Sequence, residues 1–487
     1  MKHKVSKPTT PGETLSGISR RELIAGAIVA AAAGCAPQAQ RQPSGQTAAG
    51  LPTGDRKLVR NACVLTMDPN VGDFDRADVL VEGTRIAAVQ PDLEVTADAV
   101  IDGEHLIAIP GFVDTHRHIW QGALRNILPN GLLGDYTRDI TGTARAAFRP
   151  EDAYIGDLTS ALGAINAGVT TLLDWSHIGN TPEHTDAAIE GLRESGIRGV
   201  YAFGGGTPGP LNRFPDDIRR LRDTHFSSDD QLLTLAMAAG IDAGQWAIAR
   251  AVGASITVHA NGSGQLLAVA GAMGPDVTCI HCPSLTEAEW RLIADNGSHV
   301  SIACPIEMQM GHGIPPIQQA LDHGIRPSLS TDVETEIPGE FFTQMRTVFS
   351  LQRMQALARR AAGEANAPDL LTVKDVLGFA TVQGARDNWL EDKIGSLTPG
   401  KEADMILLRT DRINVMPVNN AYGAVVLGMD TSNVEAVFIR GRIRKWRGEL
   451  VDVDLNRIHR LATGSRDYIV EAAGWPRTLL GGYLPGH

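Results

Sequence analysis

The middle of the chain repeats one pattern eight times, a short apolar run of strand character followed by a stretch of helical periodicity. The eight runs are residues 107–114, 170–174, 198–203, 232–238, 255–258, 277–280, 300–303 and 327–330. Strands that alternate with helices are typical of a parallel α/β architecture. Eight repeats predict a (β/α)8 barrel of the TIM type, in which chemistry is placed at the carboxyl ends of the strands.

Four histidines and one aspartate stand where such strand ends are expected. His116 and His118 end the first run, His259 follows the fifth, His281 the sixth, and Asp332 the eighth. Because side chains alternate along a strand, His116 and His118 point to the same face. One histidine after an apolar run is usually a buried packing residue, but five such positions in barrel order predict a metal site. This donor set suits zinc, with ferrous iron as the alternative.

The segments on either side of the barrel predict a second, smaller unit. Short strand-like runs fill residues 55–106 and recur in residues 393–452, separated by turn residues such as those at 398–400. We expect both parts to pair into one β-sandwich that flanks a barrel of residues 107–392. A helical tail is expected in residues 453–487.

The first 35 residues have the pattern of an export signal. Arg20 and Arg21 precede an apolar run at residues 24–33, which is too short to span a bilayer but suits a signal peptide. The paired arginines resemble a twin-arginine signal, and the small residues before Cys35 resemble a lipoprotein cleavage site, so Cys35 is the expected lipidation site. Residues 36–54 then form a linker. The alternative is a cytoplasmic protein whose leader carries a chance arginine pair.

Charge and cysteine usage exclude other classes of protein. The 487 residues include 44 basic and 56 acidic side chains, a net charge of −12, so nucleic-acid binding is not indicated. Membrane association is expected only through the lipid on Cys35. Cys279 and Cys282 form a single C-x-x-C without the second pair of a zinc ribbon, and they are interpreted as small buried residues.

With these residues placed, the chain resembles the amidohydrolase superfamily, in the branch that contains cytosine deaminase, guanine deaminase and the triazine hydrolases. The resemblance covers residues 57–449 and is carried by four motifs: Pro-Gly-Phe-Val-Asp-Thr-His-Arg-His at 110–118, Gly-Val-Thr-Thr-Leu-Leu-Asp at 168–174, Ser-Thr-Asp at 330–332, and Ile-Gly-Ser-Leu-Thr-Pro-Gly-Lys-Glu-Ala-Asp at 394–404. It implies that His116, His118, His259 and Asp332 hold the metal. His281 is then a ligand or a partner of the attacking water, and Asp332 and His281 are the catalytic residues.

Two departures from the family pattern refine this expectation. Binuclear members carry a lysine or glutamate on the fourth strand, which is absent from residues 232–239, so the resemblance implies one ion per chain. Deaminases of this branch commonly have His-x-x-Glu after the fifth strand, whereas Gly262 stands at the glutamate position here. Glycine cannot transfer protons, and ordinary base deamination is therefore in question. Many relatives associate, which implies a homo-oligomer.

Three functions remain in view. The leading one is a hydrolase that uses metal-activated water to cleave a non-peptide C–N bond in a small amide, urea or aminated heterocycle. The second is a deaminase of a heterocyclic base with a relocated proton shuttle. The third, a catalytically silent, lipid-anchored binding protein on the same scaffold, is disfavoured because all five ligand positions are occupied.

Other residues are weaker candidates for the substrate site. Trp120 and Gln121 follow the metal pair and resemble the substrate-contacting loop of this branch. His177, just past the second strand, is expected either to contact substrate or to lie on the surface. Glu307 and Glu334 are candidate proton shuttles, with solvated loop glutamates as the alternative. Arg117, between two inward-facing histidines, is expected in a structural ion pair.

Overall fold

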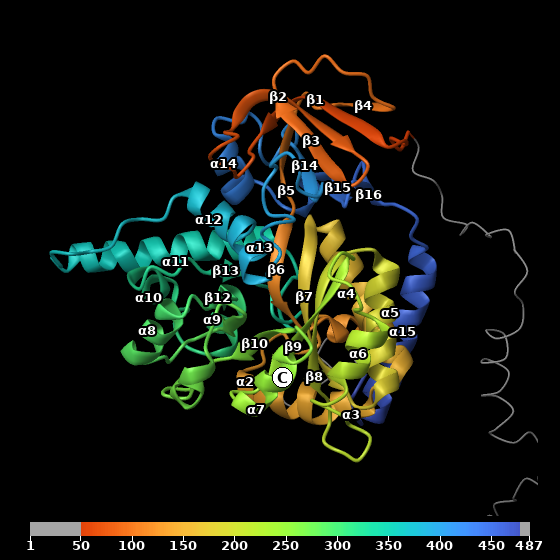
Figure 1. Ribbon diagram of the computed structural model, residues 1–487, viewed down its shortest axis with the longest axis vertical. Helices are drawn as coiled ribbons and strands as arrows, with labels where there is room; N and C mark the ends of the chain where they lie inside the picture. The colour runs from red at the N-terminus through yellow and green to blue at the C-terminus, as the bar shows by residue number, and fades with distance from the viewer. Residues whose placement is uncertain (1–49, 478–487) are drawn as a thin grey trace, which may run out of the picture. The chain divides into compact units, whose positions relative to one another are not determined.

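The computed structural model describes residues 50–477. Their strands form two sheets, an eight-stranded parallel barrel and a nine-stranded mixed sheet. Both expected parts of the fold are therefore present, and Figure 1 shows the mixed sheet packed at one end of the barrel. The expected signal peptide, Cys35 and all but the end of the 36–54 linker lie outside the described residues.

The barrel follows the order of the chain, from β6 to β13, with every neighbouring pair parallel. Its strands are β6 (Phe112–Arg117), β7 (Val169–Gly179), β8 (Arg198–Gly205), β9 (Leu233–Ala239), β10 (Ser255–His259), β11 (Val277–Ile280), β12 (His299–Ile302) and β13 (Ser328–Leu329). The last strand meets the first through a parallel bridge between Arg117 and Asp332. Backbone bonds from Asp332 N–H to the His116 carbonyl (3.0 Å) and from His118 N–H to the Asp332 carbonyl (2.8 Å) complete this closure. Barrel closure thus places three site residues side by side.

The first predicted strand, residues 107–114, is wrong as a single element. The structure divides it into β5 (Leu106–Pro110), which belongs to the mixed sheet, and β6, which begins the barrel. Gly111 marks the division, because a Cβ there would lie 2.1 Å from Oγ1 of Thr170. Close approach of β7 requires glycine at this corner, and Pro110 before it cannot donate a ladder hydrogen bond.

Both ends of the chain build the mixed sheet. Its strands are β1 (Arg56–Val64), β2 (Phe74–Glu82), β3 (Arg85–Gln90), β4 (Ala99–Asp102), β5, β14 (Met405–Arg409), β15 (Val434–Ile439), β16 (Arg442–Trp446) and β17 (Glu449–Leu450). β5 joins the halves, since it pairs in parallel with β1 and antiparallel with β14. Alternate side chains from both halves form one apolar core, which includes Val79, Leu407 and Phe438.

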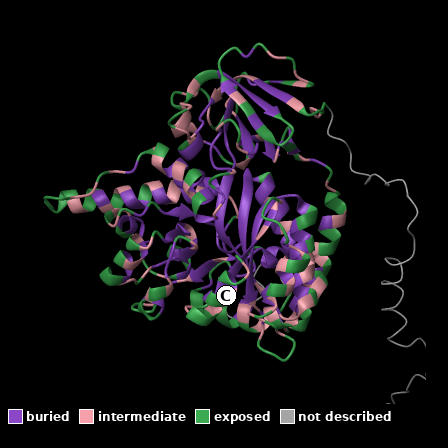
Figure 2. Ribbon diagram, in the orientation of Figure 1, coloured by how far each residue is buried: buried purple, intermediate pink, exposed green. Residues whose placement is uncertain are grey.

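Helices cover the outside of the barrel, and the buried residues concentrate in the strands that they surround (Figure 2). The longer helices are α4 (Pro150–Asn166), α5 (Pro182–Ser195), α6 (Ile218–Thr224), α7 (Ala243–Arg250), α8 (Glu287–Asp295), α9 (Cys304–Met310), α10 (Ile317–Asp322), α11 (Phe341–Ala361), α12 (Val373–Phe379), α13 (Val382–Asp387) and α15 (Leu455–Ala472). The predicted tail helix is α15, which packs against α4. Within residues 50–477, no helix combines the length and the apolar character needed to cross a bilayer.

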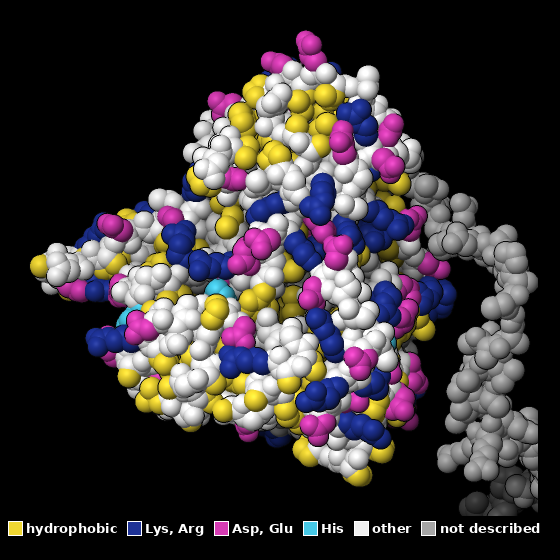
Figure 3. All heavy atoms as spheres, in the orientation of Figure 1, with side chains coloured by type: hydrophobic (Ala, Val, Ile, Leu, Met, Phe, Trp, Pro, Cys, Tyr) yellow, Lys and Arg dark blue, Asp and Glu magenta, His cyan; other side chains and the backbone are white. Residues whose placement is uncertain are grey.

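The surface carries both signs of charge. On the face shown in Figure 3, lysine and arginine side chains alternate with aspartate and glutamate side chains over the barrel helices. With a net charge of −12, this mixed face offers no broad basic stripe of the kind that binds nucleic acid.

Candidate metal centre

The five predicted ligand residues meet at the carboxyl ends of the barrel strands. Their donor atoms form two groups that share His116, namely His116, His118 and His259, and His116, His281 and Asp332; within each group all donor atoms lie within 4.8 Å of one another. Nε2 of His116 lies 3.1 Å from Oδ1 of Asp332 and 3.2 Å from Nε2 of His259, and Nε2 of His118 lies 3.3 Å from the same aspartate oxygen. The two groups therefore overlap at His116 and together form one cluster of five side chains.

Backbone strain turns two of these side chains toward this cluster. His281 and Asp332 have φ angles of 67° and 60°, in the left-handed region that non-glycine residues rarely adopt. Each follows a barrel strand, where an extended continuation would carry its side chain elsewhere. Such conformations cost of order 1–3 kcal/mol each and gather at functional sites.

Hydrogen bonds fix which nitrogen two of the imidazoles present. Nδ1 of His118 donates to the backbone carbonyl of Trp175 at 3.0 Å, so its Nε2 lone pair faces the cluster. Nδ1 of His281 donates to Oε1 of Glu307 at 3.0 Å, and the same oxygen accepts from the Ala303 N–H at 2.8 Å. Carbonyl and carboxylate partners of this kind orient the histidines of metal sites and raise their basicity.

The charge states suit a cation. Burial lowers the pKa of His118 to about 3 and holds the pKa of His116 and His259 below the usual value, so these rings are neutral. Burial acts against ionisation of Asp332, but its hydrogen bond with His116 and the neighbouring imidazoles hold the pKa of this carboxyl well below its usual range. Neutral imidazoles beside an ionised carboxylate are the states that bind a divalent metal.

The spacing of the donor atoms also fits an ion. Ligands about 2.1 Å from a tetrahedral zinc are about 3.4 Å apart. Three separations are close to that edge: 3.1 Å from His116 to Asp332, 3.2 Å from His116 to His259 and 3.3 Å from His118 to Asp332. His281 is farther away, with Nε2 3.8 Å from Oδ2 of Asp332, which suits either a fifth ligand or a group that contacts water.

Behind the cluster, Arg117 forms the expected ion pairs. Its guanidinium is fully buried, 3.5 Å from Oδ2 of Asp114 and 3.7 Å from Oε1 of Glu334. Glu334 also contacts Nε of Arg125 at 3.3 Å and accepts a hydrogen bond of 2.6 Å from the Ser160 hydroxyl. Both oxygens of Glu334 therefore have partners. The carboxylate stabilises the position of Arg117 on β6 and does not serve as a proton shuttle.

The other candidates lie on one side of the cluster. Nε1 of Trp120 donates to Nδ1 of His177 at 3.1 Å, and the His177 ring centroid is 4.2 Å from that of His118. His177 is half-buried, and burial lowers the pKa of its imidazole. Nε2 of Gln121 donates to the hydroxyl of Tyr136 at 2.5 Å. The buried Trp120 and Gln121 and the half-buried His177 thus form a polar wall next to His118.

Sequence reasoning missed several neighbours of the cluster. The ring of Trp175 lies 4.0 Å from that of His259, and the ring of His312 lies 4.7 Å, edge to face, from that of His281. Both ring nitrogens of His312 are buried without a hydrogen-bond partner among the described residues. His312 stands on a loop between Gly311 and Gly313, both of positive φ, and this Gly-His-Gly pattern was the available signal. Glu336 and Tyr136 had no comparable signal.

At position 262 the space that a side chain would enter is taken by the flexible side chain of Gln265. A Cβ built on Gly262 would lie 2.2 Å from Nε2 of Gln265. The amide of an exposed glutamine therefore occupies the space that a side chain at 262 would enter. An amide does not act as a general acid or base, so Gln265 does not replace the missing carboxyl.

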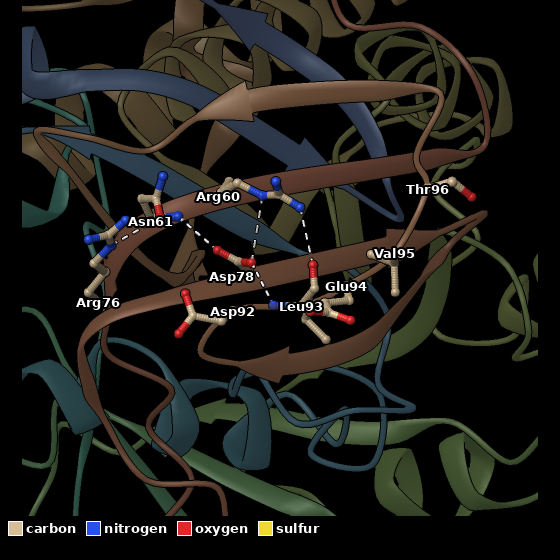
Figure 4. Close-up of a pocket in the computed structure, with 9 residues that line it drawn as sticks. All are labelled: Arg60, Asn61, Arg76, Asp78, Asp92, Leu93, Glu94, Val95 and Thr96. Atoms are coloured by element: carbon tan, nitrogen blue, oxygen red, sulfur yellow. Dashed lines mark hydrogen bonds and ion pairs between the residues drawn. The ribbon is translucent and has the colours of Figure 1, made fainter.

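A hollow of about 660 Å³ lies on the mixed sheet, well separated in the fold from the strand ends (Figure 4). Its polar groups bond to one another: Arg60 donates to the Leu93 carbonyl at 3.1 Å and faces Asp78, while Arg76 donates to Asn61 at 2.7 Å. Because these partners already satisfy one another, the hollow is not a candidate for catalysis.

Comparison with known proteins agrees with this geometry. The chain is 26% identical over 410 residues to 5'-deoxyadenosine deaminase from Methanosarcina barkeri, covering 79% of this chain and 92% of that one. A zinc-bound adenosine deaminase structure from Xanthomonas campestris superposes with a TM-score of 0.73 at 21% identity, over 85% and 98% of the two chains. A zinc complex of atrazine chlorohydrolase from Arthrobacter aurescens gives 0.71 at 23% identity, over 84% and 100%. Residues 107–444 match the profile of the Amidohydrolase family, and the chain belongs to this family of metal-dependent hydrolases that act on non-peptide C–N bonds.

Proposed function

We propose that this protein is a metal-dependent aminohydrolase that deaminates an adenine nucleoside or a related aminated heterocycle. The observation that carries the proposal is the convergence of His116, His118, His259, His281 and Asp332 in one cluster at the strand ends. The substrate class is supported by relatives that match over most of their length and are named deaminases of 5'-deoxyadenosine. Of the substrate classes expected from the sequence, these relatives favour an aminated heterocycle over an amide or a urea.

The cluster would hold one divalent ion through His116, His118, His259 and Asp332, with His281 as a further ligand or a contact of water. Zinc is the proposed ion because the donor spacing fits it and two similar structures are described with bound zinc. Such an ion supplies Lewis acidity that makes water a nucleophile at neutral pH.

The protein's own groups would manage the protons. Asp332, ionised and beside three imidazoles, accepts a proton from the attacking water and delivers it to the leaving nitrogen. Glu307 holds Nδ1 of His281, which leaves Nε2 to polarise the substrate. Trp120, Gln121 and His177 are proposed to contact the heterocycle, since they form the polar wall beside His118.

The test is ammonia release by the full-length, zinc-loaded protein from 5'-deoxyadenosine and adenosine, with a urea and a simple amide run in parallel. We expect ammonia from a nucleoside and its loss in His118→Ala. The matched control is His459→Ala, which removes an exposed histidine on α15 and should leave the rate unchanged. Release of a larger amine from the urea or amide would instead support the broader hydrolase. Absence of any turnover by metal-loaded, folded protein would support the silent binding protein.

We also propose that the protein is exported and anchored to the cell envelope through lipid on Cys35. The support is the sequence alone, Arg20 and Arg21 before an apolar run and Cys35. Cys35→Ser should release the protein from the membrane fraction, and Arg20→Lys with Arg21→Lys should block export. Wild-type protein found only in the cytosolic fraction would contradict this proposal. We further propose a homo-oligomer, which sedimentation velocity tests directly.

A further inference from the structure

Deamination of a heterocycle needs a proton donor that the family position no longer supplies. The ring nitrogen next to the reacting carbon must gain a proton when water adds, and Gly262 carries no acid. The inference drawn here rests on the proposed deaminase function and names the group that replaces that acid.

Three glutamates are buried near Asp332 in the described part of the chain. Glu307 binds His281 and the Ala303 N–H, and Glu334 binds two arginines and Ser160. Glu336 differs from both: it is 7% exposed, and neither of its carboxyl oxygens has a hydrogen-bond partner among residues 50–477. A buried carboxylate without partners is costly, whereas the neutral acid costs far less.

The backbone holds Glu336 beside the site. It lies four residues after Asp332, on a buried loop that follows β13. The N–H groups of Asn126 and Leu128 donate to the carbonyls of Glu334 and Thr335 at 2.9 and 3.0 Å, which ties this loop to the segment that follows the metal histidines. These bonds hold the backbone just before Glu336 next to the loop that follows His116 and His118.

Three acidic groups act on Glu336 electrostatically, the carboxyls of Asp332 and Asp135 and the phenol of Tyr136, and the half-buried guanidinium of Arg145 acts on the same phenol. Burial, and next the charge of Asp332, raises the pKa of Glu336 to about 8. At neutral pH the group is then a carboxylic acid, a state in which a buried carboxyl can donate a hydrogen bond or a proton.

We propose that Glu336 is the acid–base residue that takes the place of the glutamate missing at position 262. As the water oxygen bonds to the amine-bearing carbon, Glu336 gives its proton to the adjacent ring nitrogen and Asp332 receives one proton of the water. The C–N bond then breaks, and its electron pair leaves with the amine, which takes the proton of Asp332 and departs as ammonia. The hydroxyl proton of the adduct then passes to Glu336. The product ring carries N–H and C=O, Glu336 is again protonated, and Asp332 is again ionised.

The test compares Glu336→Gln with wild type and with Glu391→Gln, which removes an exposed glutamate and should change nothing. We expect kcat for ammonia release to fall by about 10² to 10⁴-fold in Glu336→Gln, with metal content and KM near wild type. In wild type, kcat/KM should fall as the pH rises through the pKa of Glu336, since the acid form is needed, and this limb should be missing in the variant. If Glu336→Gln does not fold by circular dichroism, Glu336→Met, which also removes the acid and suits a buried position, is read by the same criteria.

Infrared spectroscopy gives a readout that does not depend on turnover. The carbonyl band of a protonated carboxyl should be present at pH 7 in wild type and Glu391→Gln, and reduced in Glu336→Gln. The role of Glu336 would be overturned if the rate of Glu336→Gln were within twofold of wild type, or if the substitution left the infrared spectrum unchanged. Either result would leave the deaminase function standing. Failure of wild type to release ammonia from any aminated heterocycle would instead overturn the proposed function itself.

Discussion

Glu307 offers a sharp test of how the protein supports its metal centre. Its Oε1 accepts hydrogen bonds from Nδ1 of His281 at 3.0 Å and from the Ala303 N–H at 2.8 Å, all in a buried setting. Burial lowers the pKa of His281, but the hydrogen bond to Glu307 and the charge of Asp332 outweigh it, and the pKa is raised overall. Glu307→Gln keeps an acceptor oxygen but removes the charge. Hydrogen-bond partners of metal-site histidines contribute about 10 to 100-fold to metal affinity or activity. We therefore expect Glu307→Gln to lower kcat/KM or zinc affinity by about 10 to 100-fold, with little change in the free energy of unfolding.

Glu307→Ala should behave differently from Glu307→Gln. It leaves two buried N–H donors unpaired, each at about 1–3 kcal/mol, so the free energy of unfolding should fall by about 2–6 kcal/mol. Zinc competition against a chromophoric chelator, urea unfolding of the metal-free protein and steady-state kinetics measure the three quantities. The reasoning fails if Glu307→Gln matches wild type in affinity and rate, or if Glu307→Ala unfolds at the urea concentration of the Glu391→Gln control.

Three further predictions follow from other contacts. Removal of metal by a chelator should abolish turnover, and about one equivalent of zinc per chain should restore it; recovery that needs two equivalents would contradict the mononuclear site. Arg198 is buried on β8, where it forms ion pairs with Glu402 and, at 2.8 Å, with Asp404 at the junction with the mixed sheet. Arg198→Ala should therefore lower the free energy of unfolding by about 3–5 kcal/mol, because it leaves buried carboxylates without their partner. Urea titrations measure this loss, and an unchanged midpoint would refute it. Burial holds the pKa of Asp174 above its usual value, so the folded state binds a proton that the unfolded chain releases, and stability should fall as the pH rises above the ordinary carboxyl range. Asp174→Asn should make the fall of the urea midpoint with pH less steep, and an equal slope in both proteins would count against a shifted pKa.

The barrel and the five clustered residues could be predicted because both follow from the repeated strand–helix pattern of the sequence. Strands of a parallel barrel are continuous apolar runs, and their carboxyl ends must meet, so His116, His118, His259, His281 and Asp332 could be grouped without coordinates. The division of residues 107–114 could not be seen, because Pro110 and Gly111 interrupt the run without changing its apolar character.

Site residues outside the strand ends were harder to predict because loops have no repeating hydrophobic pattern in the sequence. His312 and Glu336 approach the cluster from loops whose paths depend on tertiary contacts, such as the bond from Leu128 N–H to the Thr335 carbonyl. Glu307 and Glu334 each lie five residues past the end of a barrel strand, so they looked equivalent in the sequence. Only their partners separate them, since Glu307 contacts His281 and Glu334 contacts arginines.

Elemental mass spectrometry of the purified full-length protein shows whether this cluster holds one ion. We expect one zinc per chain in wild type and none in the double variant His116→Ala with Asp332→Ala, which removes the residue shared by both donor groups together with the carboxylate. Two ions per chain, or one ion that persists in the double variant, would contradict this expectation.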